Sequence, residues 1–379
     1  MIVHICCSVD SHYFLQNIQK EYPDEEILGY FYDPNIQPYS EYRLRFLDVA
    51  YSCKKLGIKL LEGPYDLESW LRSVKGLENE PEKGDRCTVC FDKRLETTVK
   101  QGIKLGHKSF TTTLLISPKK SQDKLEKIGQ DLEKKYGIKW IFKDYRSGNG
   151  TQIQGQIVKE NSLYRQNYCG CIFGLKPQRQ YQDKLMDEMF SSLGQQIMPS
   201  SIEQRLQLYH KRDYYEEHNI KYKIIKNRIL NYRLLSGRVK VKKRVVPSYI
   251  LAYSTLQNNK MNGRIEYTHS NINYLNRNEV KVLDINNFNS LANSSYKNVY
   301  ELLYNPLVFE DELNIRHQIT KNPYDLSTIV ILDKIEDEKY EIELNTKIYE
   351  DVQETILIEE ISKKDIKIKE LLKEYENIS

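Results

Sequence analysis

Short apolar segments alternate with amphipathic segments through the first 175 residues of the chain. The apolar segments have the length of strands, and the segments between them repeat apolar residues at the three-and-four spacing of a helix. This alternation is typical of an α/β fold in which helices cover both faces of a parallel, doubly wound sheet. The predicted strands are IVHICC (2–7), EILGYFYDP (26–34), IKLLEGPYD (58–66), SFTTTLLISP (109–118) and IKWIFKDYR (138–146).

The whole chain has 379 residues, which is more than one hydrophobic core usually fills. We therefore predict two domains, residues 1–175 and residues 176–379, with a smaller α+β fold for the second. Within it, residues 205–230 have a helical pattern and residues 236–254 have the pattern of strands around a turn. Residues 347–378 have the pattern of a strand followed by an amphipathic helix.

Six of the seven cysteines form three tight pairs: Cys6 with Cys7, Cys87 with Cys90, and Cys169 with Cys171. The first residues show no cationic leader, and no apolar run is long enough to cross a bilayer. We therefore expect a cytoplasmic protein that does not bind membranes. A reducing compartment disfavours disulfides, so the paired thiols are candidate metal ligands or nucleophiles.

The remaining cysteine, Cys53, differs from the paired ones. It lies in the helical pattern FLDVAYSCKKLG, beside the apolar residues Val49 and Leu56. This setting predicts a buried structural thiol and not a ligand.

The number of paired thiols favours iron over zinc. A zinc site needs four ligands, and here six thiols occur without a histidine at metal-ligand spacing. Soft thiolates suit iron–sulfur clusters, which usually take four protein ligands. A cluster with a second metal, or with a redox-active thiol pair, accounts for the surplus. Asp10 follows Cys7 at the spacing of a CxxC pair and is a further candidate ligand, with a helix-capping carboxylate as the alternative.

Several of these residues fall where a doubly wound sheet binds its ligands. That place is the crevice beyond the carboxyl ends of the strands. Cys6 and Cys7 end the first predicted strand, Asp33 and Asn35 lie at the end of the second, and Ser117 is at the end of the fourth. We expect the three cysteine pairs to meet in this crevice. The segment CCSVDS after the first strand lacks the glycines of a phosphate loop, which disfavours the usual mode of ATP binding.

Five sequence blocks occur in a characteristic order: HICC (4–7), DPNIQPYSEYRLR (33–45), EPEKGDRCTVCFDKRL (80–95), FTTTLLISPKK (110–120) and KENSLYRQNYCGCIFG (159–174). Together they resemble the QueH-type epoxyqueuosine reductases. The resemblance covers about residues 1–175 and does not reach residues 176–379. Many members of that family have a third cysteine where this chain has Asp10, and others have aspartate.

The resemblance implies a fold of the HUP-like, nucleotide-binding α/β/α class and an oxidoreductase activity. The implied reaction reduces the epoxide of epoxyqueuosine in the tRNA anticodon loop to the alkene of queuosine, the last step of queuosine biosynthesis. It also implies a [4Fe–4S] cluster, an adjacent iron or other divalent metal, and an unidentified electron donor. Such a reduction takes two electrons and two protons and needs a polarised C–O bond, which a cluster and a Lewis-acid metal would supply.

The resemblance also implies site residues. The expected metal ligands are Cys6, Cys7, Asp10, Cys87, Cys90, Cys169 and Cys171, of which the first three are also the expected catalytic residues. We assign the cluster to Cys7, Asp10, one thiol of the 87/90 pair and one of the 169/171 pair, and the second metal to Cys6 and the remaining thiols. Candidate substrate contacts are Asp33, Asn35, Tyr42, Arg43, Arg86, Ser117, Lys159, Tyr164 and Arg165, with turn chemistry, solvated charge or packing as the alternatives.

The second domain has an uneven charge distribution. Residues 218–265 contain no Asp or Glu, and twelve Lys or Arg residues are interleaved there with tyrosines. Cations and aromatic side chains together are typical of an RNA-binding face, so Lys242, Lys243 and Arg244 are candidate tRNA contacts. The alternative is a strand with one solvated face. The acidic tail from Glu310 onward is expected to pack against this basic surface, or to be a solvated face.

Two other functions fit the same residues. One is a different tRNA-modifying enzyme on this scaffold, such as a sulfur transferase, although the missing phosphate loop disfavours it. The other is a non-catalytic RNA-binding module stabilised by zinc.

Overall fold

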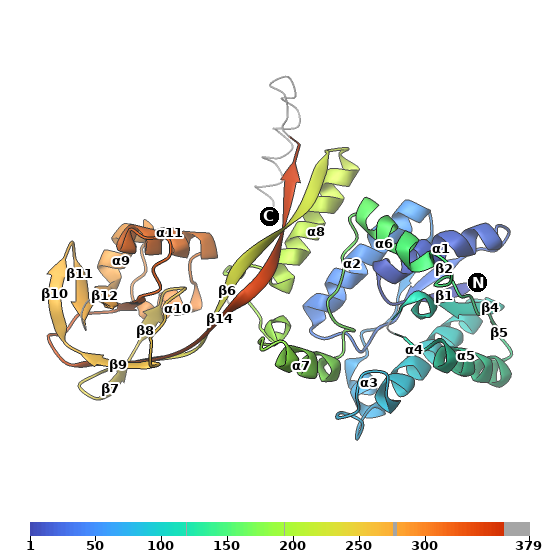
Figure 1. Ribbon diagram of the computed structural model, residues 1–379, viewed down its shortest axis with the longest axis horizontal. Coiled ribbons are helices and arrows are strands. Elements are labelled where there is room, and N and C mark those ends of the chain that lie inside the picture. Colours follow the sequence, from blue (N-terminus) through green and yellow to red (C-terminus); the bar gives the residue numbers. More distant parts are fainter. Residues whose placement is uncertain (119, 193, 276–278, 360–379) are drawn as a thin grey trace. The chain divides into compact units, whose positions relative to one another are not determined.

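The computed structural model describes residues 1–118, 120–192, 194–275 and 279–359 (Figure 1). The chain divides into two compact units. In the described part of the chain, unit 1 comprises residues 1–189, 205–225 and 355–359, and unit 2 comprises residues 190–204 and 226–354. Unit 1 therefore contains sequence from both sides of the predicted boundary at residue 175.

Unit 1 is built on a five-stranded sheet in which all strands are parallel. The spatial order is β3-β2-β1-β4-β5, which confirms the predicted doubly wound sheet. Ile5 is in register with Phe31, and His4 with Thr112, so the ends of β1, β2 and β4 lie together. The strands are β1 (Ile2–Ile5), β2 (Leu28–Phe31), β3 (Lys59–Glu62), β4 (Ser109–Thr112) and β5 (Lys139–Trp140).

Helices cover both faces of this sheet. Figure 1 shows α1 (Ser8–Glu21), α2 (Tyr39–Leu56) and α6 (Gly150–Glu160) on one face and α4 (Asp85–Lys104) and α5 (Gln122–Tyr136) on the other. Cys53 is buried in the core that α2 contributes to, as its helical pattern predicts. Two shorter helices, α3 (Leu67–Ser73) and α7 (Ile172–Tyr181), complete the unit together with α8 (Ile202–Glu217), which begins in unit 2.

The fourth and fifth strands are shorter than predicted. After β4 the chain enters a 3-10 helix, η1 (Thr113–Ile116), so Ser117 lies beyond this turn and does not end the strand. The segment after β5 turns away because the Arg146 guanidinium donates hydrogen bonds to the carbonyls of Leu115 (Nε–O 2.6 Å) and Lys120 (Nη1–O 3.0 Å).

The predicted helix over residues 205–230 is wrong in its second half. Helix α8 ends at Glu217, and strand β6 begins at Tyr222. Asn219 has a positive φ of 54°, a left-handed conformation that ends a helix, and β-branched and aromatic residues follow it. Beyond β14 (Tyr340–Ile358), the predicted amphipathic helix lies outside the described residues.

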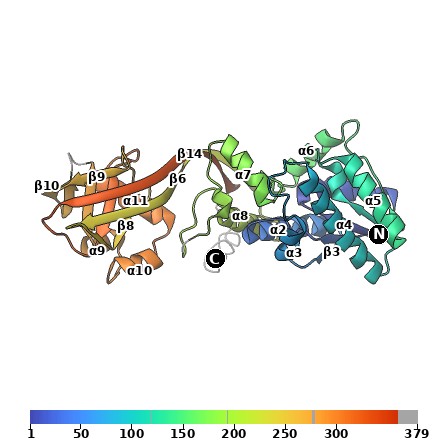
Figure 2. The same ribbon diagram turned by 90° about the horizontal axis from the view of Figure 1, so that it is seen from below.

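Unit 2 contains a four-stranded sheet, a five-stranded sheet and three helices. The first sheet has the order β7-β6-β14-β9, and Figure 2 shows β6 and β14 as two long strands side by side. The second has the order β10-β11-β12-β13-β8, with one parallel pair, β12 with β13. The remaining elements are β6 (Tyr222–Val241), β7 (Arg244–Val246), β8 (Ser248–Ile250), β9 (Lys260–Gly263), β10 (Ile265–His269), β11 (Ile272–Leu275), β12 (Val280–Asp284), α9 (Ile285–Ala292), α10 (Val299–Tyr304), α11 (Phe309–Thr320) and β13 (Thr328–Leu332).

Alternation along β13 shows how unit 2 is layered. Ile329 and Ile331 pack into a core with Phe288 of α9, whereas Val330 and Leu332 pack into a core with Ile342 of β14. Since successive side chains of a strand point to opposite faces, the five-stranded sheet lies between helices and the other sheet. The predicted strand–turn–strand of residues 236–254 is confirmed in β6, β7 and β8.

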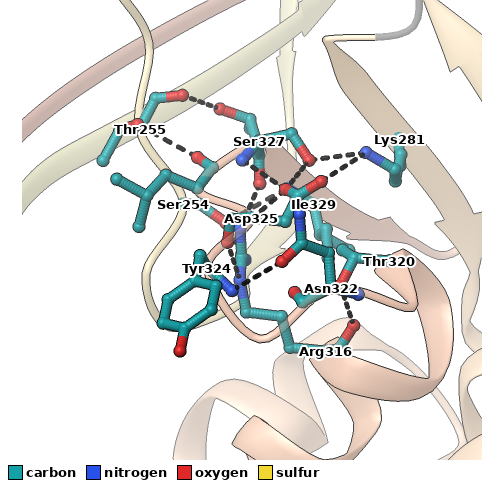
Figure 3. A network of polar contacts seen from close by, with 12 residues as sticks. Ser254, Thr255, Lys281, Arg316, Thr320, Asn322, Tyr324, Asp325, Ser327 and Ile329 are labelled. Atoms are coloured by element: carbon teal, nitrogen blue, oxygen red, sulfur yellow. Dashed lines mark hydrogen bonds and ion pairs between the residues drawn. The ribbon is translucent and has the colours of Figure 1, made fainter.

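A buried cation fixes the loop before β13. The Arg316 guanidinium donates hydrogen bonds to the carbonyls of Ala252 (3.0 Å), Asp325 (3.0 Å) and Ser327 (2.5 Å) (Figure 3). The carboxylate of Asp325 also lies 3.8 Å from the ammonium of Lys281. These contacts satisfy the backbone of an irregular segment, and we assign them a structural role.

A second buried cation, Arg212 of α8, belongs to unit 1. Its Nη1 forms an ion pair with Asp48 of α2 and donates a hydrogen bond to the Ser162 carbonyl (3.1 Å). The same Asp48 carboxylate accepts hydrogen bonds from the Ser8 hydroxyl and from the Tyr164 amide (2.9 Å). Asp48 therefore joins the start of α1, the segment before the third cysteine pair, and α8.

We expect Arg212→Met to destabilise unit 1 by about 3–5 kcal/mol, because it leaves a buried carboxylate without its cation. Urea unfolding followed by tryptophan fluorescence measures this directly, since both tryptophans of the chain, Trp70 and Trp140, lie in unit 1. Lys54→Met is the matched control, because Lys54 forms an exposed ion pair with Glu217 of the same helix. Equal midpoints for the two variants would contradict the role given to Arg212.

Candidate metal centre

A cavity of about 410 Å³ lies in unit 1 at the carboxyl ends of the strands, and all six paired cysteines line it. The predicted convergence of the three pairs is thus confirmed. Cys6 and Cys7 form the junction between β1 and α1, and Cys169 and Cys171 precede α7. Cys87 and Cys90 lie inside the first turns of α4, which begins at Asp85.

Three of the predicted ligands form one compact group. The ligand atoms of Cys6, Cys7 and Asp10 all lie within 4.8 Å of one another. The Sγ of Cys6 is 3.7 Å from the Sγ of Cys7 and 3.6 Å from Oδ2 of Asp10. The other oxygen of Asp10 accepts a hydrogen bond from Nε2 of Gln154 (3.1 Å), which orients the carboxylate. Asp10 is buried, so an exposed capping role does not describe it.

The other four paired thiols also line the cavity. Cys90 and Cys171 are buried against Trp70 and Val74, with Cys169 packed beside them. The amide of Lys83 donates a hydrogen bond to the Sγ of Cys87 (3.3 Å). In both groups the thiols are free, without disulfides.

The protonation of the thiols differs within this cavity. A hydrogen bond from Cys171 lowers the pKa of the Cys169 thiol to about 5, with the Lys120 charge acting in the same direction against burial. A hydrogen bond with Cys6, together with burial, raises the pKa of Cys7 well above its ordinary value.

Five cationic side chains line the cavity, Arg45, Arg86, Arg94, Lys120 and Arg165, against three carboxylates, Asp10, Asp33 and Glu82. The excess of positive charge favours bound thiolates.

This donor set fits an iron–sulfur group. Four thiols are the usual complement for one cluster, and two thiols with a carboxylate form a mixed set that leaves coordination positions open. The cavity is also large enough to admit a ligand between the two groups.

The Cys169-Gly170-Cys171 loop is held by the loop that follows β2. The amide of Gln37 donates a hydrogen bond to the Gly170 carbonyl (2.8 Å), and Arg45 donates to the Cys169 carbonyl (3.2 Å). Gly170 has φ +108°, and a Cβ there would lie 2.8 Å from Cγ1 of Ile36. Only glycine therefore allows this close approach of the two loops.

Five of the predicted substrate contacts line the cavity: Asp33, Asn35, Arg86, Ser117 and Arg165. Asp33 and Asn35 are buried, and Asp33 forms an ion pair with Arg94. The Arg86 guanidinium instead donates to the backbone carbonyls of Leu77 (3.3 Å) and Glu78 (3.0 Å), so it holds the loop before α4.

The other four predicted substrate contacts in unit 1 do not line the cavity. The Tyr42 hydroxyl donates to Glu62 (3.1 Å), and the Arg43 guanidinium pairs with the same carboxylate (2.8 Å). The Tyr164 hydroxyl donates to Glu41 (3.0 Å) inside the core. Lys159 is exposed on α6. Structural hydrogen bonds or solvation account for these residues.

Sequence reasoning missed four residues at the cavity or beside it: Arg45, Lys120, Gln154 and His4. His4 was detectable as a polar residue inside an apolar strand; its Nδ1 lies 2.7 Å from the Thr112 hydroxyl, and burial, with the Arg94 charge, lowers its pKa well below the ordinary value. Arg45 and Lys120 end two of the sequence blocks that carry the family resemblance, which could have drawn attention to them, whereas Gln154 lies outside these blocks.

The basic residues of unit 2 are largely paired with glutamates. Lys226, Arg228, Arg238 and Lys240 of β6 form ion pairs with Glu354, Glu350, Glu343 and Glu341 of β14. Lys242 lies 3.3 Å from Glu336 and 3.4 Å from Glu338. Lys243 and Arg244 are exposed at the hairpin turn between β6 and β7.

The sheet order and the thiol-lined cavity define an α/β protein with the donor set of a metalloenzyme. The family model "Epoxyqueuosine reductase QueH" matches residues 1–177. The Epoxyqueuosine reductase QueH of Helicobacter pylori is 37% identical over 364 residues, which are 93% of this chain and 98% of that protein. The chain therefore belongs to the QueH family of epoxyqueuosine reductases.

Shorter relatives match the N-terminal half. The Epoxyqueuosine reductase QueH of Thermotoga maritima is 38% identical over 183 residues, 48% of this chain and 92% of that protein. Among solved structures, the U34-tRNA thiolase NcsA from Methanococcus maripaludis with its [4Fe-4S] cluster matches at 12% identity and a TM-score of 0.22, covering 42% of this chain and 66% of that one. A similarity this low decides nothing about the chain.

No helix in the described ranges is long and apolar enough to cross a membrane.

We expect Gly170→Ala to lower both bound iron and the stability of unit 1, the latter by about 1–3 kcal/mol, because it strains the backbone and separates the two loops. Iron analysis after anaerobic purification and urea unfolding measure the two effects. Gly57→Ala is the matched control: Gly57 has φ +66°, but an added Cβ meets nothing within 4 Å. If both variants keep the same iron, the docking of the loops does not position the ligands.

Proposed function

We propose that this chain reduces the epoxide of epoxyqueuosine in tRNA to the alkene of queuosine, as the name of its family states. The observation that carries the proposal is the meeting of six thiols and Asp10 around one cavity in a chain that matches a curated relative along almost its whole length. A sulfur transferase and a zinc-stabilised RNA module remain as outcomes of the metal analysis below.

The grouping of the thiols supports a different ligand partition from the one expected from sequence. We assign the [4Fe–4S] cluster to Cys87, Cys90, Cys169 and Cys171, which all line the cavity and of which the last three pack together. We assign the second iron, or another divalent metal, to Cys6, Cys7 and Asp10, whose ligand atoms lie within 4.8 Å of one another. When bound, these groups supply single electrons and a Lewis acid for the epoxide oxygen.

The protein's own residues shape the space between the two groups. Arg45, Arg94 and Lys120 line the cavity and offset the charge of the thiolates. Asn35 presents an Oδ1 without a hydrogen-bond partner among the described residues, which suits a hydroxyl of the cyclopentane ring. The exposed Arg165 at the cavity suits a phosphate of the anticodon loop.

The order of the strands supports a HUP-like subclass. In β3-β2-β1-β4-β5 the crevice lies at the ends of β1 and β4, where nucleotide-binding relatives of this architecture hold their ligand. Here Cys6 and Cys7 take the place of a phosphate loop. A cytoplasmic location, the tRNA substrate and an electron donor of unknown identity complete the proposal.

We expect Cys169→Ser and Cys171→Ser to lose most of the bound iron and to abolish epoxide reduction. The assay incubates epoxyqueuosine-containing tRNA anaerobically with a chemical reductant and analyses the nucleosides by mass spectrometry. Cys53→Ser is the matched control, because this buried thiol lies outside the cavity, and it should keep both iron and activity. Wild-type protein with zinc alone, or without acid-labile sulfide, would contradict the proposal.

Unit 2 is the candidate tRNA-binding surface from sequence, but its charge is balanced. Residues 190–204 and 226–354 contain 18 Lys and Arg and 18 Asp and Glu, because the acidic strand β14 belongs to the same unit as the basic strand β6. The cations left exposed at the β6–β7 turn, Lys243 and Arg244, form a smaller surface than the sequence suggested. We keep the β6–β7 turn as the proposed contact with tRNA.

Reversing Lys242, Lys243 and Arg244 to glutamate should weaken tRNA binding and flatten its salt dependence by up to about one unit of log–log slope per lost phosphate contact. Iron content should stay the same. Reversal of the exposed Lys297, Lys321 and Lys339 is the matched control in the same unit. Equal affinity and equal salt slope for the two triple variants would exclude the turn as a tRNA contact.

A further inference from the structure

Asp33 is a buried carboxyl that lines the cavity and is not one of the proposed metal ligands. It follows β2 at the carboxyl end of the sheet, where β2 pairs in parallel with β1. Its side chain is 1% exposed and lines the cavity. A carboxyl in this position lies among the thiols without belonging to either group of ligands.

The two oxygens of Asp33 have different surroundings. Oδ1 forms the ion pair with Nη2 of Arg94 on α4, and Nε2 of His4 lies 3.9 Å from the same oxygen. Oδ2 is buried and has no hydrogen-bond partner in the described part of the chain. A buried carboxylate oxygen without a partner is costly unless it is protonated or meets a ligand.

The other carboxyls of the cavity are engaged. Asp10 is hydrogen-bonded to Gln154 and to the Cys6 thiol. Glu82 is 44% exposed and pairs with Lys120 at 3.9 Å. Asp33 is therefore the carboxyl best placed to transfer a proton inside the cavity.

We propose that Asp33 is the general acid that protonates the epoxide oxygen as the C–O bond breaks. The inference rests on the proposed reductase function. One epoxide C–O bond breaks as an O–H bond forms with the proton from Asp33. The second C–O bond breaks with a second proton from solvent, two electrons from the reductant of the reaction form the C=C bond, and the oxygen leaves as water. Solvent then reprotonates the Asp33 carboxylate.

Burial supports a proton on Asp33 against the neighbouring positive charges. Burial raises its pKa to about 6, and the charges of Arg94 and Arg45 oppose this rise. The groups that face Asp33 are His4 on β1, Arg45 and Tyr42 on α2, and Arg94 on α4. His4 carries no charge near neutral pH, since its pKa is lowered well below the ordinary value. A carboxyl with this pKa holds enough protons near neutral pH to act as an acid.

The test is single-turnover reduction of epoxyqueuosine in tRNA by the pre-reduced, iron-loaded protein. Asp33→Asn keeps an oxygen for Arg94 but cannot donate an acidic proton. We expect its rate constant to fall at least about 100-fold, while iron content and affinity for queuosine-containing product tRNA stay the same. Asp33→Glu should restore part of the rate. In the wild type, the rate constant should fall as the pH rises through the pKa of Asp33, and Asp33→Asn should lack this dependence.

Other results would overturn the inference. A rate constant for Asp33→Asn within tenfold of wild type excludes a proton transfer from this residue. A loss of rate matched by an equal loss of product affinity assigns Asp33 to substrate positioning. If Asp33→Asn does not retain iron, the Asp33→Glu variant is used instead. Full iron content in Asp33→Glu, together with a pH profile of the rate constant that is unchanged from wild type, also rejects Asp33 as the general acid. Failure of the wild type to reduce epoxyqueuosine tRNA rejects the proposed function itself and is distinguished from all these results.

Discussion

The carboxylate of Asp48 holds together the parts of unit 1 that carry the thiols. It accepts hydrogen bonds from Ser8, directly after Cys7, and from the amide of Tyr164, five residues before Cys169, and it pairs with Arg212 of α8. All these groups are buried, where an unpaired charge is strongly unfavourable. The first and third cysteine pairs therefore depend on one ion pair whose cation comes from outside the region matched by the family model, residues 1–177.

A second constraint acts inside the cavity. Parallel strands bring their carboxyl ends to one edge, so Cys6 and Asp33 become neighbours although they are far apart in sequence. The loop after β2, through Gln37, and helix α2, through Arg45, then hold the Cys169-Gly170-Cys171 loop. One loop thus both positions thiols and supplies the carboxyl that we propose as the acid.

Much of this arrangement follows from sequence. Hydrophobic periodicity predicted the five parallel strands, and the doubly wound topology predicted the meeting of the cysteine pairs. The ends of β4 and β5 could not be predicted, because Arg146 fixes them through hydrogen bonds to distant carbonyls. The ligand partition that we propose from the structure differs from the one expected from sequence, since spacing along the chain does not show that Cys6, Cys7 and Asp10 form one group.

The charge of the surface of unit 2 also could not be predicted from the sequence. A window free of acidic residues suggested a basic face, yet Arg228 pairs with Glu350 and Arg238 with Glu343. These partners are 122 and 105 residues apart, because β14 returns beside β6. Charge counted along a sequence therefore overstates the charge of a surface whenever the neighbouring strand is distant in the chain.

Mössbauer spectroscopy of the protein loaded anaerobically with ⁵⁷Fe tests the central claim most directly, that two separate ligand groups share one cavity. The account predicts the signal of a [4Fe–4S] cluster together with a distinct iron site of roughly one fifth of the absorption. Asp10→Ala should remove the distinct site and leave the cluster. A single cluster signal that is lost or altered in Asp10→Ala would contradict the account, because Asp10 would then be a ligand of the cluster.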